Sequence, residues 1–357
     1  MYKRQVVLIV LITCAAYYPA LQAGFIWDDD FYVTENHLLT APDGLRRIWL
    51  TTESPSQYFP LTYTVFMIER GLWNLEPMGY HLVNIALHAF NALLVLLLCT
   101  RLGLRGAWMI AAVFALHPVH VESVAWVTEL KNVLSGMFCL LSLLCYLRFE
   151  DDQAWKWYAG SIVLFSLALL SKTVVLTLPV VILLIRWWRK RSITLRDINP
   201  LIPFMLIGVG MGLLSMWWET NHQGTTGEVF EFSLLQRILL SGRAIWFYAI
   251  KLLWPMNLTF SYPQWILDPR EIVQYGWHIG LVGAGVLLWY MRDRWGRGPL
   301  AGIAIFIITL SPLLGFINYY TMRLSLIHIS EPTRPRLVSR MPSSAGKRGG
   351  GGGGGGG

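Results

Sequence analysis

Charged residues are scarce in this sequence. Only 14% of its 357 residues are charged and 55% are hydrophobic, whereas an ordinary soluble domain has roughly a quarter charged residues. That deficit excludes the water-soluble fold classes, because the chain has too little polar surface to cover a globular core. Its length has room for about ten spans of roughly 20 residues. The composition therefore predicts an all-α membrane protein with a single membrane domain.

Cysteines are also few, and they form no framework. All four, Cys14, Cys99, Cys139 and Cys145, lie inside apolar runs, so we interpret them as small apolar residues rather than a disulfide set or metal site. The net charge of +8 comes partly from residues 324–357, where five basic side chains face only Glu331. The remaining excess lies in short loops, as in membrane proteins. We therefore expect no nucleic-acid partner.

The sequence changes character at Leu324. LSLIHISEPTR and VSRMPSSA resemble a translated sequencing adapter, and Gly349–Gly357 is an unbroken glycine run. A flexible glycine-rich tail is the alternative. Artefactual segments are left out of fold reasoning, so we divide the chain into a membrane domain, residues 1–323, truncated after Arg323, and a disordered artefact, residues 324–357.

Basic loops predict the orientation of the chain. Lys3 and Arg4 precede an apolar run without a clean cleavage site, which favours an uncleaved first helix with a cytoplasmic N-terminus. Further basic loops contain Arg101 and Arg105, Arg148 and Lys156, the run Arg186 to Arg196, and Arg292 to Arg297. Nine spans result, near residues 5–22, 80–100, 106–118, 132–148, 157–171, 173–188, 200–218, 276–291 and 299–316. The outer side then receives residues 24–79, 117–131, the turn at Lys172, and 219–275.

One apolar stretch departs from this pattern. Residues 236–253 carry Arg237, Arg243 and Lys251, and a span there would put the basic loop at 292–297 on the outside. We therefore predict an interfacial or re-entrant helix.

Three consecutive aspartates open the first outer loop. Asp28, Asp29 and Asp30 follow Trp27, and their mutual repulsion favours either a raised pKa or a bound cation. Both suit a general base or a metal-phosphate site. The alternative is a solvated, charged helix end.

A second polar group follows the third predicted span. His117, His120 and Glu122 lie within six residues, with Glu129 and Lys131 just behind. No standard zinc spacing is matched, so hydrogen bonding to a substrate or packing between helix ends is favoured over metal ligation.

Other outer polar groups are less specific. Gln57 and Tyr58 precede an apolar helix, and His81, Asn84, His88 and Asn91 form a stripe at helical spacing, which predicts packing against other helices. Lys172 interrupts an apolar hairpin, where an ammonium is costly unless paired; snorkelling to the interface is the alternative. We expect Lys172, Glu122 and Asp28 or Asp29 to converge on one outer cavity, where shared pairing or a phosphate ligand lowers that cost.

Six segments carry a resemblance that covers nearly all of residues 1–323. They are GFIWDDDFYVTEN, SQYFPLTYTVF, GYHLVNIALHAFNALLV, LHPVHVESVAWVTELKNVLSG, LLSKTVVLTLPVVILL and SPLLGFINYYTMR. In order, they resemble the bacterial relatives of the transmembrane and tetratricopeptide-repeat O-mannosyltransferases, which belong to the GT-C superfamily of membrane glycosyltransferases.

The resemblance implies a GT-C-like helical bundle in a bacterial inner membrane, with its active site on the periplasmic face. It implies a polyprenyl-phosphate-linked sugar donor, a protein or glycan acceptor, Asp28 or Asp29 as catalytic base, Glu122 as a second acidic group, and Lys172 on the donor phosphate. Asp30 belongs to the same cluster. A divalent cation, if one binds, would use Asp28, Asp29 and Glu122. Relatives continue past NYYTMR into tetratricopeptide repeats, which this sequence lacks.

Three other functional classes are alternatives to this resemblance. An O-antigen ligase or polymerase would rely on outer arginines, for which Arg46, Arg47 and Arg70 are candidates. A non-catalytic scaffold for a missing repeat domain is an alternative outside enzymes. A transporter would need repeat symmetry and a charged pathway near the midplane, which the sequence does not show.

The predicted orientation is testable by thiol labelling. With the native cysteines replaced, a cysteine at Asp43 should react with an impermeant thiol reagent added to intact cells, and a cysteine at Ser192 should not, because the basic run Arg186 to Arg196 favours the cytoplasm. Labelling at Ser192 in intact cells would overturn the assignment.

Overall fold

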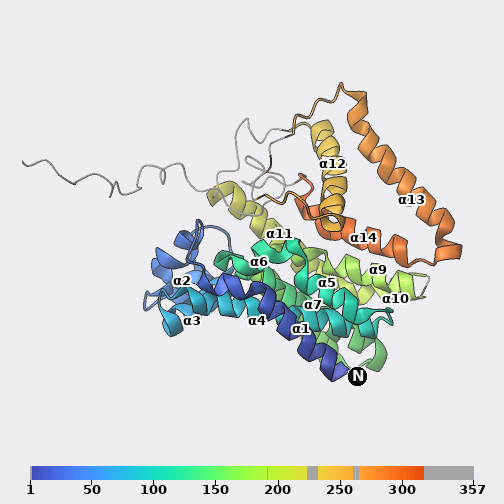
Figure 1. Cartoon of the computed structure of the whole chain (residues 1–357). Coiled ribbons are helices and arrows are strands. Elements are labelled where there is room, and N and C mark those ends of the chain that lie inside the picture. The colour runs from blue at the N-terminus through green and yellow to red at the C-terminus, as the bar shows by residue number, and fades with distance from the viewer. Residues whose placement is uncertain (1, 191, 223–231, 260–261, 263–264, 317–357) are drawn as a thin grey trace, which may run out of the picture.

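The structure is a computed structural model that describes residues 2–190, 192–222, 232–259, 262 and 265–316. Within these residues the secondary structure is entirely helical, without a strand, as the all-α prediction required. Figure 1 shows one bundle formed by the N-terminal two thirds of the chain, with α12, α13 and α14 standing to one side of it. The predicted artefact at 324–357 lies outside the described residues.

The first helix leads into a compact unit of short helices, residues 18–73, called the N-terminal unit below. Helix α1 (Tyr2–Tyr17) continues as a 3-10 turn, Tyr18–Gln22, and is followed by a π-helical turn, Asp30–Thr34. Next come a 3-10 turn, His37–Leu39, and helices α2 (Gly44–Leu50) and α3 (Pro60–Trp73). Tyr32, Leu38, Ile48, Tyr63 and Phe66, none more than 1% exposed, form its core.

Helices α4, α7 and α8 form the centre of the bundle. Helix α4 (Pro77–Arg101) packs on α5 (Ala107–Leu116) and α7 (Leu130–Asp152), and α7 pairs with α8 (Trp155–Ser171). The hydroxyls of Ser142 and Ser161 each donate to the other residue's carbonyl at 2.8 Å. Small side chains allow this close approach, and the paired bonds satisfy both hydroxyls inside apolar surroundings.

The polar stripe on α4 packs against other helices, which confirms the sequence prediction. Asn84 donates to the Trp126 carbonyl at 2.9 Å, and Asn91 donates to the Val133 carbonyl at 2.8 Å. His88 Nε2 lies 3.0 Å from the Ala115 carbonyl oxygen. Each of the three polar side chains therefore ties α4 to the segments around α5 and α7.

A helix lies at every one of the nine predicted spans. The remaining ones are α9 (Leu178–Lys190), α11 (Ile202–His222), α13 (Gly276–Trp295) and α14 (Gly298–Leu310). Within the described residues, five helices are long and apolar enough to cross a membrane, and α5 with the bent segment after it would make six. These helices mark a membrane protein, while the count of nine spans stays a prediction.

The predicted hairpin at Lys172 is a helix break. Helix α8 ends at Ser171, Lys172 is extended (φ −162°, ψ 129°), and a 3-10 turn, Thr173–Thr177, leads into α9. Thr62 of α3 donates a hydrogen bond to the Ser171 carbonyl at 3.1 Å. The N-terminal unit thus contacts the chain directly before the lysine.

Arg186 is not an exposed loop residue, although its position in a basic run suggested one. It lies inside α9, 8% exposed, with its guanidinium 2.9 Å from a Glu150 carboxylate oxygen, 3.1 Å from the Tyr146 hydroxyl and hydrogen bonded to Asp197. Asp197 belongs to α10 (Leu195–Ile198), where its carboxylate also completes a capping box with Thr194. The basic run therefore begins with Arg186 in a buried ionic cluster and not in an exposed loop.

Residues 236–253 form a helix, as predicted. Helix α12 (Leu234–Leu253) carries three cations. Arg243 stacks 4.3 Å from the centre of the Trp265 ring, Lys251 donates to the Met256 carbonyl at 2.6 Å, and Arg237 donates to the Gly315 carbonyl at 2.6 Å. Rings and carbonyls can accompany these cations at a membrane boundary. Its interfacial or re-entrant placement stays a prediction.

Glu69 is a buried carboxyl group in the N-terminal unit. It is 3% exposed on α3, and neither of its oxygens has a hydrogen-bond partner among the described residues. Burial disfavours the charged form and raises the pKa of Glu69 to about 8. The folded chain therefore holds this proton up to higher pH than the unfolded chain, which loses it near 4.3.

We expect Glu69→Gln to remove a pH-dependent loss of stability. Because the pKa of Glu69 is raised in the folded chain, its burial costs the wild type no free energy of unfolding below about pH 4.3. The wild type then loses stability as the pH rises toward 8 and changes little above that. In detergent, thermal unfolding should show the variant similar to wild type at pH 5 and more stable at pH 9, by on the order of 4 kcal/mol at most.

Glu76→Gln, at an exposed carboxyl before α4, is the matched control and should leave the difference between the two pH values unchanged. If the two substitutions changed the pH dependence of stability equally, the assignment of a raised pKa to Glu69 would be wrong.

Candidate active site

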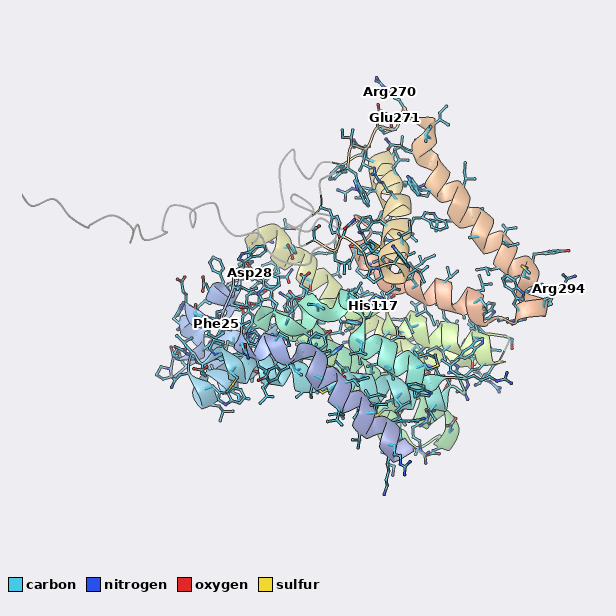
Figure 2. All side chains as sticks on the ribbon, in the orientation of Figure 1. Phe25, Asp28, His117, Arg270, Glu271 and Arg294 are labelled. Carbon is cyan, nitrogen blue, oxygen red and sulfur yellow. The ribbon has the colours of Figure 1, made fainter. Side chains whose placement is uncertain are left out.

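The aspartates after α1 are buried, which excludes a solvated helix end for two of them. Asp28 is 1% exposed and Asp29 is 0% exposed, while Asp30 is half-buried and accepts a hydrogen bond from the Thr34 hydroxyl at 2.9 Å. Trp27 before them has a positive φ of 49°, a conformation that is uncommon outside glycine. This sharp turn directs the aspartates into the protein. Figure 2 shows Asp28 and Arg294 on opposite sides of the molecule.

Asp29 fastens the first loop to the segment that precedes α7. One carboxylate oxygen accepts from the Ile26 backbone N–H at 2.8 Å, and the other accepts from the Thr128 N–H at 2.8 Å and from the Thr128 hydroxyl. Burial raises the pKa of Asp29, and these hydrogen bonds and the charge of Lys131 act in the opposite direction. Both oxygens are therefore occupied by structural bonds.

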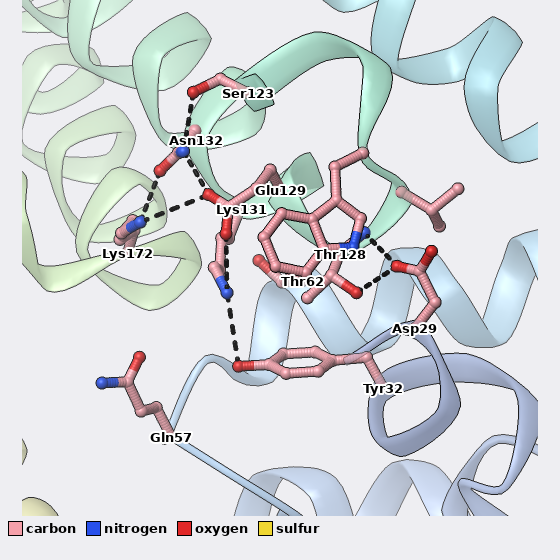
Figure 3. A network of polar contacts seen from close by, with 12 residues as sticks. Asp29, Tyr32, Gln57, Thr62, Ser123, Thr128, Glu129, Lys131, Asn132 and Lys172 are labelled. Atoms are coloured by element: carbon pink, nitrogen blue, oxygen red, sulfur yellow. Dashed lines mark hydrogen bonds and ion pairs between the residues drawn. The ribbon is translucent and has the colours of Figure 1, made fainter. Parts of the chain in front are cut away.

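Glu129 lies at the centre of a buried ionic cluster (Figure 3). It is 2% exposed, with Oε1 3.2 Å from Lys131 Nζ and Oε2 3.7 Å from Lys172 Nζ. Asn132 also donates to Oε2. One carboxylate thus contacts two buried ammonium groups, which lowers the desolvation cost that each would bear alone.

Lys131 is held beneath an aromatic pair. It is 0% exposed, its Nζ lies 3.5 Å from the Tyr32 hydroxyl and 4.7 Å from the centre of the same ring. The Tyr32 ring stacks on Tyr63 at 5.3 Å. The ring face adds a cation–π attraction, so Lys131 joins the N-terminal unit to the start of α7.

Lys172 approaches the same cluster from the break after α8. It is 3% exposed, and its ammonium donates to Asn132 Oδ1 at 2.5 Å. The paired state that the sequence argument required is therefore present, and snorkelling to the interface is not observed. The sequence argument expected a phosphate or carboxylate partner without naming one, and the carboxylate in contact with Lys172 is Glu129.

Glu122 lies one turn away from this cluster. It is half-buried on α6 (Val121–Ala125), and the next residue, Ser123, accepts a hydrogen bond from Asn132 Nδ2 at 3.0 Å. Lys131, Glu129, Asn132 and Lys172 therefore form one connected group of side chains, to which α6 is attached through Ser123. Asp29 bonds to Thr128, the residue directly before Glu129.

The histidines take packing roles. His81 is 1% exposed beside the backbone of Ala23 and Ala125. His117 Nε2 lies 2.8 Å from the Leu252 carbonyl oxygen, and His120 stacks 4.6 Å from the Phe114 ring. Within the described part of the chain, no three His, Cys, Asp or Glu side chains form a group that could hold a metal ion.

Gln57 and Tyr58 connect the first loop to α11. The Gln57 amide donates to Glu219, the Tyr58 hydroxyl donates to the Trp49 carbonyl at 3.0 Å, and the Tyr58 ring lies 5.4 Å from Trp218. Figure 3 shows Gln57 across the cluster from Ser123. Glu219, 3% exposed, was missed by the sequence argument; its signal was a lone carboxylate at the outer end of an apolar run.

Fold and site together define a helical membrane protein with a buried cluster of lysines and carboxylates beside one end of its helices. The chain is homologous over part of its length to protein O-mannosyl-transferases. Protein O-mannosyl-transferase TMTC3 of Mus musculus is 31% identical over 182 residues, 47% of this chain and 20% of the relative. TMTC2 of Homo sapiens is 34% identical over 163 residues, 41% and 20% of the two chains.

Protein O-mannosyl-transferase F38B6.6 of Caenorhabditis elegans is 22% identical over 343 residues, 88% of this chain and 46% of the relative. The chain thus spans 20% of the length of the first two relatives and less than half of the third. No family model matches, and no solved structure matches. The homology supports a glycosyltransferase class and agrees with the resemblance seen in the sequence.

Removing the Asp29 carboxylate should destabilise the fold. Asp29→Ala leaves the Thr128 N–H and hydroxyl without their buried acceptor, a loss of about 3 kcal/mol, so thermal unfolding in detergent should shift several degrees lower. Asp30→Ala is the control, because Asp30 bonds within its own turn, and should cost less than about 1 kcal/mol. Equal shifts would show that Asp29 does not anchor the loop.

Proposed function

We propose that this chain is the membrane part of a glycosyltransferase that moves a sugar from a polyprenyl-phosphate donor to a hydroxyl of a protein or glycan. The observation that carries the proposal is the buried cluster of Glu129, Lys131 and Lys172 next to the aspartates of the first loop. The homology to protein O-mannosyl-transferases supports the same chemistry.

Lys172 is the group proposed for the donor phosphate. Its shorter contact is with the neutral Asn132 at 2.5 Å, and the Glu129 oxygen is farther away at 3.7 Å. These two contacts hold the ammonium in one position. In a low-dielectric site that charge stabilises the leaving phosphate more strongly than it would in water.

Asp28 is the proposed general base, with Asp29 as its anchor. The two share a turn, and the structural bonds of Asp29 fix the backbone that carries Asp28. Glu122 is the proposed second acidic group, since it adjoins Ser123 on the far side of the cluster. Asp30, whose carboxylate bonds to Thr34, has no assigned step.

The proposed reaction is a substitution at the anomeric carbon. The acceptor oxygen forms a bond to that carbon as the bond to the phosphate oxygen breaks, and the breaking bond's electron pair stays on the phosphate. The acceptor proton passes to the Asp28 carboxylate. Lys172 balances the charge that develops on the phosphate.

The proposed setting is the outer face of a bacterial inner membrane, with a cytoplasmic N-terminus. Residues 1–323 would form the transferase domain, and a GT-C-like architecture is part of the proposal. Support comes from the basic loops, which favour the cytoplasm, among them the end of α13, where Arg294 lies in the last turn (Figure 2).

The proposal predicts that two single substitutions abolish transfer. Membranes containing the full chain are supplied with radiolabelled mannose on a polyprenyl phosphate and with a hydroxyl-containing acceptor peptide. Asp28→Asn should lower transfer by about 100-fold or more because the proton acceptor is lost, and Lys172→Met should lower it similarly because the phosphate loses its counter-charge.

Asp43→Asn is the matched control, because Asp43 is an exposed carboxylate that pairs with Arg47. Wild-type transfer by both site variants, with insertion checked by thiol labelling, would refute the mechanism. A well-inserted wild-type chain that consumes no donor would favour the scaffold alternative. Arg47, the candidate of the ligase alternative, is already paired with Asp43 and Glu53.

A further inference from the structure

Trp27 occupies a backbone position that disfavours a bulky side chain. The Asp29 N–H donates to the Ile26 carbonyl at 3.0 Å and closes a turn in which Trp27 is the first central residue, with φ 49°. Turns with a positive φ at this position usually contain glycine, asparagine or aspartate there, because a bulky side chain is strained in that conformation. The turn itself therefore gives no reason for a tryptophan.

The surrounding structure holds the turn in this conformation. The Ile26 N–H donates to the Asp29 carboxylate at 2.8 Å, and the Ile26 carbonyl also accepts from the Trp126 indole N–H at 3.3 Å. The Asp30 N–H donates to the Trp27 carbonyl at 3.2 Å. Strained residues persist where neighbouring contacts over-determine them, and such residues cluster at functional sites. Bonds on both sides of Trp27 thus fix the direction in which its side chain leaves the backbone.

Packing accounts for only part of this tryptophan. The rings of Trp27 and Trp126 meet edge to face, with 6.1 Å between their centroids and 86° between their planes. Trp126 is 4% exposed, whereas Trp27 is 49% exposed. Burial therefore stabilises about half of the Trp27 side chain and leaves the other half at the surface. The next residue in the turn is the buried Asp28, the proposed general base.

An exposed indole next to a carboxylate suits the recognition of a sugar ring. The face of an aromatic ring is electron-rich, and a face of a pyranose presents C–H groups that the neighbouring oxygens make slightly positive. These two surfaces attract each other without any charge on the ligand. Because Trp27 and Asp28 are consecutive residues of one turn, a pyranose stacked on the indole is kept close to the carboxylate. Figure 2 shows Asp28 at one end of the bundle, near Phe25.

We infer that Trp27 is a specificity-determining residue that stacks on the pyranose ring of the substrate at Asp28. The inference rests on the proposed function and deepens it, because it names the group that recognises the sugar rather than the phosphate or the proton. The same chemistry applies to the sugar of the lipid donor and to a sugar already present on a glycan acceptor. The strained turn then has a purpose, since it points the indole away from the core at the residue before the base.

Two lipids that differ only in the sugar test this contact without catalysis. The full chain in detergent is titrated with mannosyl undecaprenyl phosphate or with undecaprenyl phosphate, and bound lipid is measured by native mass spectrometry. Trp27→Gly should weaken binding of the mannosyl lipid by about tenfold, the upper range for one aromatic contact, and leave binding of the sugar-free lipid unchanged. Trp27→Phe keeps an aromatic face and should retain most of the affinity.

The glycine variant separates recognition from folding. Glycine adopts a positive φ without strain, so the relief of strain offsets the lost contact with Trp126, and thermal unfolding should stay near that of the wild type. If Trp27→Gly fails to fold, Trp27→Leu, which is apolar but not aromatic, decides in its place. Trp217→Ala is the matched control: Trp217, near the end of α11, is also 49% exposed, and its loss should leave the affinity for both lipids unchanged.

The source of the sugar follows from the acceptor arm of the experiment. If Trp27→Gly leaves lipid binding unchanged but raises the KM for a mannosylated acceptor peptide about tenfold, and not the KM for the unmodified peptide, the stacked pyranose belongs to the acceptor. Weaker binding of the mannosyl lipid alone assigns the pyranose to the donor. Both results support the inference.

The remaining outcomes distinguish this inference from the proposed function. An equal loss of affinity for both lipids would show that Trp27 contacts the lipid and not the sugar. Unchanged binding of both lipids, with unchanged KM values for both peptides, would show that Trp27 recognises no sugar. Either result overturns the inference and leaves the proposed function standing. A wild-type chain that binds neither lipid and transfers no mannose would overturn the proposed function and the inference with it.

Discussion

The cost of burying two lysines constrains this whole region of the molecule. Lys131 and Lys172 are 0% and 3% exposed, and an ammonium withdrawn from water costs several kcal/mol unless a carboxylate and hydrogen bonds replace the solvent. Glu129 supplies a carboxylate in contact with both. Because the lysines come from different elements, α7 and the break after α8, this shared contact also fixes the position of those elements relative to each other.

The first loop is a structural part of this cluster rather than a covering above it. Asp29 of this loop accepts a hydrogen bond from Thr128, directly before Glu129. Tyr32 lies over Lys131, and Thr62 bonds to the carbonyl before Lys172. Gln57 reaches Glu219 at the end of α11. A change in any of these loop residues therefore acts on the buried charges through one or two contacts, which couples the stability of the loop to the chemistry of the cluster.

The sequence predicted the helices and several polar residues of the buried cluster, but it did not predict which of these residues contact one another. Apolar runs and basic loops gave a helix at each of nine ranges, and a lysine in an apolar hairpin signalled a buried partner. Periodicity could not choose between Glu122 and Glu129, because both follow the same histidine motif and only the turn at Trp126 decides which carboxylate faces Lys172. Asn132 and Glu219 gave no strong signal either, since an amide or a lone carboxylate at a helix end usually faces solvent. Arg186 was wrongly assigned to an exposed basic loop. Its basic neighbours in the sequence gave no sign that Glu150 and Asp197 would pair with it inside the protein.

Helix α7 connects two buried ionic clusters, the one around Glu129 and the one around Arg186. Lys131 stands at its first turn and Glu150, the partner of Arg186, near its last. At 1.5 Å per residue these positions are about 28 Å apart along the helix, close to the roughly 30 Å of hydrocarbon in a bilayer. The middle of the helix carries no charge, and its hydroxyl at Ser142 is satisfied by Ser161. A helix with charged clusters at both ends and an apolar middle has one favourable depth, because sliding in either direction would draw a cluster into lipid. We therefore expect the cluster at Lys131, Glu129 and Lys172 to lie at the membrane boundary, the depth that the proposed lipid-linked phosphate donor requires.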